Sequence, residues 1–311
     1  MFLLILNALL AAGAGEVQLR PLDTIHLRDP FILAMSEEKC YYLYGTGFQG
    51  LPNGPGFACF RSADLKAWEG PIAVFRRPEG FWADHEYWAP EVHRHQGRYY
   101  MFASFHAPSH TRGTQILVAD VPQGPFRVHS PEPVTPPDWE CLDGTLFIDE
   151  QQQPWIVFCH EWVQVRDGEI CARRLSGDLT RGEGDARLLF HASEAAWTGT
   201  MGFGQKEEGL ITDGPFLHRG QDGALFMLWS SFGEDKRYRQ AVARSASGTL
   251  EGPWTQSSAP VFDNDGGHGM LFRDLEGRLT LCLHQPNKSP QERPRLFRVE
   301  EKNGELALTP L

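Results

Sequence analysis

The amino-acid sequence predicts an all-β fold, a five-bladed β-propeller with four antiparallel strands in each blade. Two observations support this prediction. Five stretches repeat one plan, in which a polar or small residue precedes a short apolar strand, a polar turn and a second strand rich in aromatic residues. Gly and Pro mark tight turns between the strands, and helical periodicity is almost absent. A four-stranded unit repeated five times is typical of a propeller, whose blades surround a central channel.

The first two strands of each blade are expected in stretches of about twenty residues. In chain order these stretches are residues 28–47, 88–105, 142–162, 212–232 and 266–286. The third and fourth strands follow each hairpin, separated by Gly-containing turns. They are expected in residues 59–71, 116–128, 170–184, 241–254 and, more weakly, 295–308.

The innermost strand of a propeller blade delivers its first side chain to one shared cavity. The residues at this anchor position are Asp29, Ala89, Asp143, Asp213 and His268, spaced by 60, 54, 70 and 55 residues. Like charges enclosed together raise one another's proton affinity, so at least one of the three aspartates is expected to be protonated near neutral pH. The alternative is that each aspartate caps a turn before Gly or Pro.

Charge and the N-terminus restrict the partners and the location. A net charge of -11 and a pI near 5.5 argue against nucleic acid or an anionic membrane surface as a partner. The apolar run from Phe2 to Ala12 ends in Ala12-Gly13-Ala14, which is typical of a signal peptide and is too short for a membrane span. We expect a signal peptide at 1–14, one propeller domain at 15–311 and a secreted or periplasmic protein. A buried N-terminal strand or helix is the alternative.

The six cysteines lie far apart, with no CxxC pair and no histidine pair at zinc spacing. Each sits among apolar or aromatic residues, so we expect small buried thiols.

Five short motifs together resemble glycoside hydrolase family 43. They are RDP in the first blade, WAPEV in the second, an Asp opening the third, DGP in the fourth and GGHG in the fifth, in the family's order. The resemblance covers nearly all of the chain after the signal-like segment. It implies a five-bladed propeller that hydrolyses arabinose- or xylose-containing glycans with inversion.

The resemblance also assigns catalytic roles. It makes Asp29 the general base that activates water, and Asp143 the residue that orients the general acid and keeps its pKa high. The family's acid is a glutamate before Gly-Pro or Ala-Pro, whereas this chain has Asp213 there. The missing methylene withdraws the carboxyl group by roughly 1.5 Å, and misplacements of that order can cost about 100-fold in rate.

Three interpretations of this departure stay open. The first, which we favour, is a cavity matched to the shorter acid, because inverting sites tolerate carboxyl separations of roughly 6.5–9.5 Å. In the second, Glu161, Glu207 or Glu208 supplies the proton. In the third, the protein binds glycans without cleaving them. Acetal hydrolysis itself needs a proton donor and a base, which two carboxyls in unequal environments provide at one pH.

Sugar binding requires flat apolar faces and hydrogen-bonding groups, and residues 79–95 offer both. Trp88 is expected to stack on a sugar ring, or else to fill the blade interface with Tyr87. His85 and Glu91 are expected to bond sugar hydroxyls, and Glu91 lies on the same alternating face as the anchor. Further candidates for substrate binding are Arg28, Glu161 and His268.

The resemblance implies one further role for His268. The matching histidine in many relatives lies near the axis and can hold an ion, often calcium. A structural Ca²⁺ at His268 is therefore expected, although the chemistry requires no cofactor.

The sequence thus predicts an exo-acting, inverting glycosidase whose partner is an oligo- or polysaccharide. Arabinofuranose is the first expected product, followed by xylose and galactofuranose. Exo action is inferred from the long aromatic insertion before the second inner strand, which would close one end of a cleft. The rivals are a non-hydrolytic glycan-binding propeller and a retaining fructan-type hydrolase. The second rival is disfavoured because the Glu140-Cys141 pair precedes Asp143 instead of following it.

Overall fold

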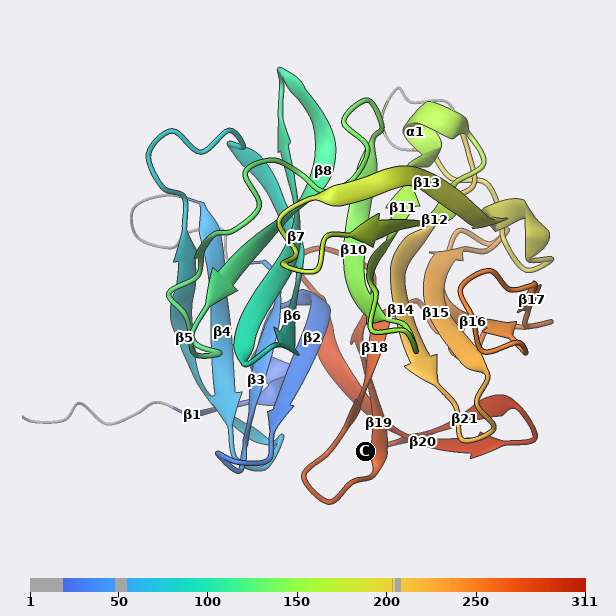
Figure 1. Ribbon diagram of the computed structural model, residues 1–311. Coiled ribbons are helices and arrows are strands. Elements are labelled where there is room, and N and C mark those ends of the chain that lie inside the picture. The colour runs from blue at the N-terminus through green and yellow to red at the C-terminus, as the bar shows by residue number, and fades with distance from the viewer. Residues whose placement is uncertain (1–18, 48–54, 203, 205–207) are drawn as a thin grey trace, which may run out of the picture.

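The computed structural model describes residues 19–47, 55–202, 204 and 208–311 (Figure 1). The predicted signal peptide at 1–14 and the candidate Glu207 lie outside these residues. The described chain forms five antiparallel sheets that follow one another in chain order, which confirms the predicted five-bladed propeller.

Each blade is built from consecutive strands. The first contains β2 (Arg28–Met35), β3 (Cys40–Thr46), β4 (Gly56–Ser62) and β5 (Ala67–Arg76). The second contains β6 (His85–His95), β7 (Arg98–Ala107), β8 (His110–Ala119) and β9 (Arg127–Val128). The third contains β10 (Cys141–Ile148), β11 (Pro154–His160), β12 (Glu169–Leu175) and β13 (Gly182–His191). The fourth contains β14 (Asp213–Arg219), β15 (Leu225–Phe232), β16 (Tyr238–Ser245) and β17 (Trp254–Gln256). The fifth contains β18 (Gly267–Arg273), β19 (Leu279–Gln285), β20 (Arg293–Lys302) and β21 (Glu305–Pro310).

The first blade departs from the prediction by one strand. A short β1 (Leu19–Pro21) pairs with the outer edge of β5, so this sheet has five strands instead of four. The helical elements of the described chain are α1 (Trp162–Val165) and two single 3-10 turns, Leu22–Thr24 and Ala192–Glu194.

The second strand of each blade is buried on both faces. β11 and β15 are buried along their whole length, and β3, β7 and β19 are buried along nearly all of theirs. Neighbouring sheets cover both faces, which explains why these strands are continuously apolar and aromatic instead of alternating. The aromatic-rich second strands of the repeat are therefore the core of the blades.

The innermost strands share a bulge at their first residues. The ladder between the first and second strand shifts register there in every blade. The bulged residue has a positive φ, 49° at Asp29, 42° at Ala89, 55° at Asp143, 52° at Gly214 and 50° at His268. The anchor of the fourth blade is thus Gly214, and Asp213 stands one position before it, level with Arg28 and Trp88. The sequence repeat was misaligned by one residue in this blade.

No described sheet combines strands from both ends of the chain. The ring is therefore closed by packing between the first and last blades. β2 lies against β18 and β19. Backbone and side-chain hydrogen bonds cross this seam, including Leu27 N–H to the carbonyl of Glu292 at 3.3 Å and Leu275 N–H to the Tyr41 hydroxyl at 2.9 Å.

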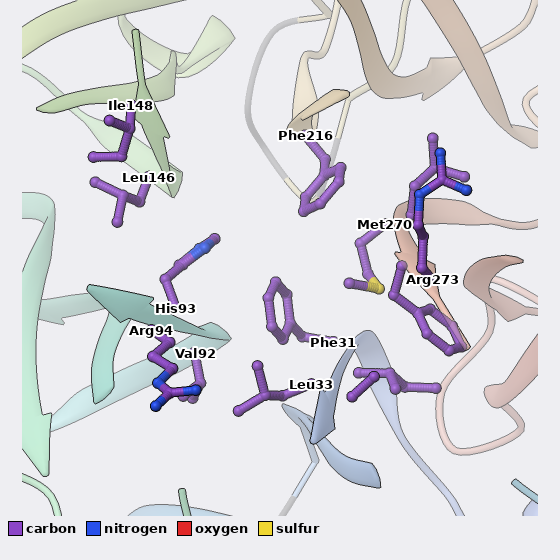
Figure 2. A pocket seen from close by; sticks show the side chains of 14 residues that line it. Phe31, Leu33, Val92, His93, Arg94, Leu146, Ile148, Phe216, Met270 and Arg273 are labelled. Carbon is purple, nitrogen blue, oxygen red and sulfur yellow. The ribbon is translucent and has the colours of Figure 1, made fainter. Parts of the chain in front are cut away.

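The axis of the propeller has two different ends. One is a cavity of about 360 Å³ lined mainly by apolar side chains from the inner strands, and Figure 2 shows Phe31, Phe216 and Met270 around it. The other is a cleft of about 1470 Å³ at the bulged ends of the inner strands. The predicted catalytic residues lie at this second end.

All six cysteines are buried free thiols, as expected. In the part of the chain that the structure describes, no helix is long and apolar enough to cross a bilayer.

Candidate active site

The cleft collects the polar side chains of several blades. It is lined by Asp29, Asp143, Asp213 and His268, together with Arg28, His85, Trp88 and Glu161. Eight of the nine predicted site residues therefore meet in one cleft. The ninth, Glu91, does not line it.

Asp29 is a buried carboxylate surrounded by positive or hydrogen-bonding groups. Its Oδ1 lies 3.2 Å from Nδ1 of His268, 3.6 Å from Nδ1 of His284 and 4.0 Å from Nε of Arg28. Burial alone would raise the pKa of Asp29, but the charges of His268 and Arg28 outweigh it and hold the pKa at about 2. Asp29 is therefore ionised near neutral pH.

Asp143 lies beside Asp29 and behaves in the opposite way. Its Oδ2 accepts the backbone N–H of Gly214 at 2.9 Å and lies 3.7 Å from Nδ1 of His268. Burial, and then the negative charge of Asp29, raise the pKa of Asp143 well above its usual range.

Asp213 is the most accessible of the three aspartates, since Asp29 and Asp143 are buried and Asp213 is partly exposed to the cleft. Its Oδ2 accepts the hydroxyl of Tyr238 at 3.0 Å. Burial, and then the charge of Asp143, raise the pKa of Asp213 to about 7, against the opposing effects of His268 and Tyr238. A carboxyl with this pKa is protonated in about half of the molecules at neutral pH.

The three aspartates therefore differ, because the pKa of Asp29 is held at about 2 whereas burial and neighbouring negative charges raise the pKa values of Asp143 and Asp213. This inequality is what simultaneous acid and base chemistry requires. It agrees with the expectation that at least one aspartate is protonated.

Glu161 sits in the cleft as a buried ion pair with Arg112. This guanidinium also binds Glu86 and lies 4.8 Å above the centre of the Trp88 ring. The ion pair holds the carboxylate of Glu161 against a cation, an arrangement that suits a binding residue better than a proton donor. One face of Trp88 is covered by Arg112, so stacking on a sugar is open to its other face.

Glu208, a second alternative acid, is exposed and bonds Thr200 Oγ1 at 2.8 Å, and it does not line the cleft. Glu91 is buried and its carboxylate lies 2.9 Å from Nε2 of His93, below the cleft. The expectation that Glu91 bonds sugar hydroxyls is not supported by this geometry, because its position two residues after the bulge places it deeper along the channel. Tyr87 packs against Phe57 and Phe105, which agrees with the alternative that it fills the blade interface.

A calcium ion at His268 stays a prediction. Calcium takes six to eight oxygen ligands, whereas Nδ1 of His268 already faces the carboxylates of Asp29 and Asp143. Oxygen ligands for a calcium ion at this imidazole would have to come mainly from water.

Three residues of the site had no signal in the sequence. Arg112 lies on β8, and Glu292 is a fully buried carboxylate that binds Arg28 at 3.0 Å. His284 accepts the backbone N–H of Asp29 at 3.2 Å and stacks on Tyr238 with ring centres 5.6 Å apart. Burial lowers the pKa of His284 to about 4, so it is neutral and accepts this bond. Their partners are up to 264 residues away in the chain, which no local motif reveals.

Comparison with known proteins points to one family. Residues 19–304 match the sequence profile described as glycosyl hydrolases family 43. The chain is 42% identical to a solved structure described as an endo-arabinase from Bacteroides thetaiotaomicron, with a TM-score of 0.86 over 92% of this chain and 98% of that one. It is 26% identical to an extracellular exo-α-(1→5)-L-arabinofuranosidase of Cellvibrio japonicus, over 87% of this chain and 76% of that protein. An exo-1,5-α-L-arabinanase from a bovine ruminal metagenomic library shares the fold, with a TM-score of 0.66 at 18% identity over 93% of this chain and 98% of the other.

Proposed function

The chain belongs to family 43 of the glycosyl hydrolases, and from this premise we propose that it is an inverting hydrolase of α-L-arabinofuranosyl linkages in arabinan-type glycans. That it is a glycosidase follows from the family. The observation that carries the mechanism is that Asp29, Asp143 and Asp213 line one cleft at one end of the propeller axis, where the pKa of Asp29 is held at about 2 and that of Asp213 is raised to about 7. The names of the 42% and 26% identical relatives support arabinose as the sugar.

Asp29 acts as the general base. Because its pKa is about 2, it is unprotonated and available to take a proton from the attacking water. The water attacks the anomeric carbon on the face opposite the leaving oxygen, and the configuration inverts. Arg28 and His268 hold Asp29 in place and keep it ionised.

Asp213 acts as the general acid. It gives its proton to the leaving oxygen as the glycosidic bond breaks. Asp143 raises the proton affinity of Asp213, and its hydrogen bond to Gly214 fixes it against the residue that follows the acid. Asp213 stands one position before the bulged Gly214 and lines the cleft.

The cleft supports an extended substrate. Its volume of about 1470 Å³ exceeds the roughly 300–1,000 Å³ of a typical small-molecule pocket. Residues 84–88 form one wall, which supports exo action from a chain end. The extracellular relative and the predicted signal peptide support secretion.

The proposal is tested on a panel of aryl α-L-arabinofuranosides, β-D-xylosides and β-D-galactofuranosides, with wild type, Asp29→Asn and Asp213→Asn. We expect arabinose release by the wild type and loss of activity in Asp29→Asn for every leaving group. Asp213→Asn should lose most activity on poor leaving groups and little on good ones, because only poor ones need the proton. Proton NMR of the first product formed should show inverted configuration.

Two outcomes would contradict the proposal. Retained configuration would favour a covalent mechanism of the fructan-hydrolase type. Silence on the whole panel and on reduced arabino-oligosaccharides, with oligosaccharide binding that survives Asp29→Asn, would identify a glycan-binding protein. On the reduced oligosaccharides, accumulation of free arabinose alone indicates exo action, whereas mixed oligomers indicate endo action.

A further inference from the structure

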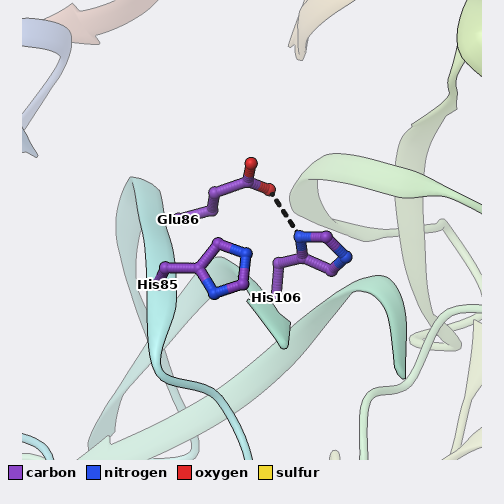
Figure 3. A group of neighbouring side chains, drawn as sticks. All are labelled: His85, Glu86 and His106. Carbon is purple, nitrogen blue, oxygen red and sulfur yellow. Dashed lines mark ion pairs between the residues drawn. The ribbon is translucent and has the colours of Figure 1, made fainter. Parts of the chain in front are cut away.

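A second group of ligand atoms lies on the cleft wall, away from the three aspartates. Figure 3 shows His85, Glu86 and His106 facing one another, from the adjacent strands β6 and β7. His85 and His106 are partners in the ladder between these strands. One ligand atom from each of the three residues lies within 4.8 Å of the other two.

From this arrangement we propose that His85, Glu86 and His106 bind a divalent transition-metal ion of the zinc type. Two imidazoles and one carboxylate form a donor set that favours Zn²⁺ over Ca²⁺ or Mg²⁺. Three protein ligands leave a coordination position for water or a substrate hydroxyl, as in open zinc sites. His85 and Glu86 line the cleft, so this position faces the bound glycan.

The contact between His106 and Glu86 supports a shared ion. Nδ1 of His106 lies 3.1 Å from Oε2 of Glu86. This buried nitrogen nevertheless forms no hydrogen bond among the described residues. The two atoms are therefore close together but not aligned as a hydrogen-bond donor and acceptor. Ligand atoms about 2.0–2.2 Å from one zinc ion stand roughly 3.3 Å apart at a tetrahedral angle. The observed spacing is close to that of two ligands of one ion.

The outer contacts support the same site. Nδ1 of His85 lies 2.5 Å from Oδ1 of Asp84, which turns Nε2 toward Glu86 and His106. Metal-binding histidines commonly donate their other nitrogen to a carboxylate in this way. Nε of Arg112 donates to the same oxygen of Glu86, Oε2, at 2.7 Å and fixes the orientation of the carboxylate.

The local charge leaves room for a dication. With neutral imidazoles, the cluster holds three carboxylates and one guanidinium: Glu86 and Glu161 pair with Arg112, and Asp84 pairs with His85. The cluster therefore carries an excess of two negative charges, which one divalent cation neutralises.

The site also connects to sugar binding. Glu86 and Glu161 hold the same guanidinium, Arg112, which covers Trp88. An ion bound to Glu86 therefore changes the charge balance at Arg112, and oligosaccharide binding and metal binding are thermodynamically linked.

The test is calorimetric titration of the untagged, chelator-treated full chain with zinc chloride near neutral pH. We expect one ion per chain. His85→Ala and His106→Ala should each abolish stoichiometric binding, and Asp84→Asn should weaken it by about 10–100-fold through the lost orientation of His85. His110→Ala is the matched control, because this exposed histidine lies on the next strand, outside the cluster, and should leave binding unchanged. Thermal unfolding without metal checks that each variant is folded.

Cobalt(II) provides a second readout, since it replaces zinc and shows intense visible absorption when four-coordinate. This absorption should appear in the wild type and in His110→Ala and be absent from His85→Ala. No stoichiometric binding by the wild type would overturn the proposal. Zinc binding that is unchanged in both His85→Ala and His106→Ala would also overturn it. If the ion is lost in His268→Ala but kept in His85→Ala and His106→Ala, the metal site lies at the propeller axis instead.

Discussion

The hydrogen bond from Tyr238 to Asp213 gives a sharp test of the general acid. Tyr238→Phe removes a donor 3.0 Å from Oδ2 of Asp213 and leaves the ring in place. This bond favours the ionised carboxylate, so its loss must raise the pKa of Asp213 from about 7. Hydrogen bonds to charged groups are worth about 1.5–3 kcal/mol. Part of that is retained when the neutral acid accepts the same bond, so we expect a shift of about one pKa unit, at 1.36 kcal/mol per unit.

The assay is the pH dependence of kcat/KM on a substrate with a poor leaving group. At pH 8 the protonated fraction of Asp213 should increase from about 0.1 to about 0.5, and kcat/KM by about fivefold. Below about pH 6 the acid is protonated in both proteins, so no gain is expected there. The position of the alkaline limb is the readout, because any loosening of Asp213 would lower the height of the curve instead.

Tyr44→Phe is the matched control. Tyr44 is fully buried and donates to the carbonyl of Pro122 at 2.6 Å, so this variant also loses a buried phenol hydroxyl. Its alkaline limb should coincide with that of the wild type. A limb that stays in place, or moves to lower pH, in Tyr238→Phe would refute the assignment of Asp213 as the acid.

Four further predictions follow from the site. Asp29→Asn should lower kcat/KM by about 10²–10⁴-fold, the usual contribution of a general base, and a smaller loss would remove Asp29 from this role. Asp213→Asn should be more stable than the wild type above pH 7. The raised pKa of Asp213 means that the folded wild-type protein loses stability as the pH rises from about 4 to about 7. The variant should therefore gain up to about 4 kcal/mol in free energy of unfolding above pH 7, and this gain should vanish near pH 4. Gly214→Ala should lower both the melting temperature and kcat, since φ is 52° and a Cβ would stand 2.8 Å from the His268 ring; an unchanged melting temperature would contradict this. Glu161→Gln should raise KM more than it lowers kcat, whereas a loss of kcat that good leaving groups rescue would move the acid role to Glu161.

The blades could be predicted because their information is local. Turn residues and strand composition repeat within about 60 residues, and the inner bulges fall on short motifs such as RDP and GGHG. The misalignment at Asp213 shows the limit of this approach. A bulge moves a residue by one position without changing the motif around it, so only the ladder reveals that Gly214 is the anchor.

The surroundings of the catalytic groups could not be predicted in the same way. Arg112, Glu292 and His284 act through partners in other blades, and their positions depend on how complete blades pack. The ion pair of Glu161 is an example, because the sequence offered Glu161 as a proton donor or a sugar-binding residue and gave no sign of Arg112 beside it. Burial beside a guanidinium from the preceding blade gives it a different environment.

The seam between the first and last blades sets the order in which a nascent chain becomes competent. Asp29 leaves the ribosome with the first blade, but the imidazoles that surround it, His268 and His284, belong to β18 and β19. Until these strands emerge and dock, Asp29 lacks the imidazoles that position its carboxylate, and Arg28 lacks Glu292. Hydrolytic competence therefore arises only after the strands of the fifth blade have emerged, so chains truncated before the fifth blade are expected to be inactive.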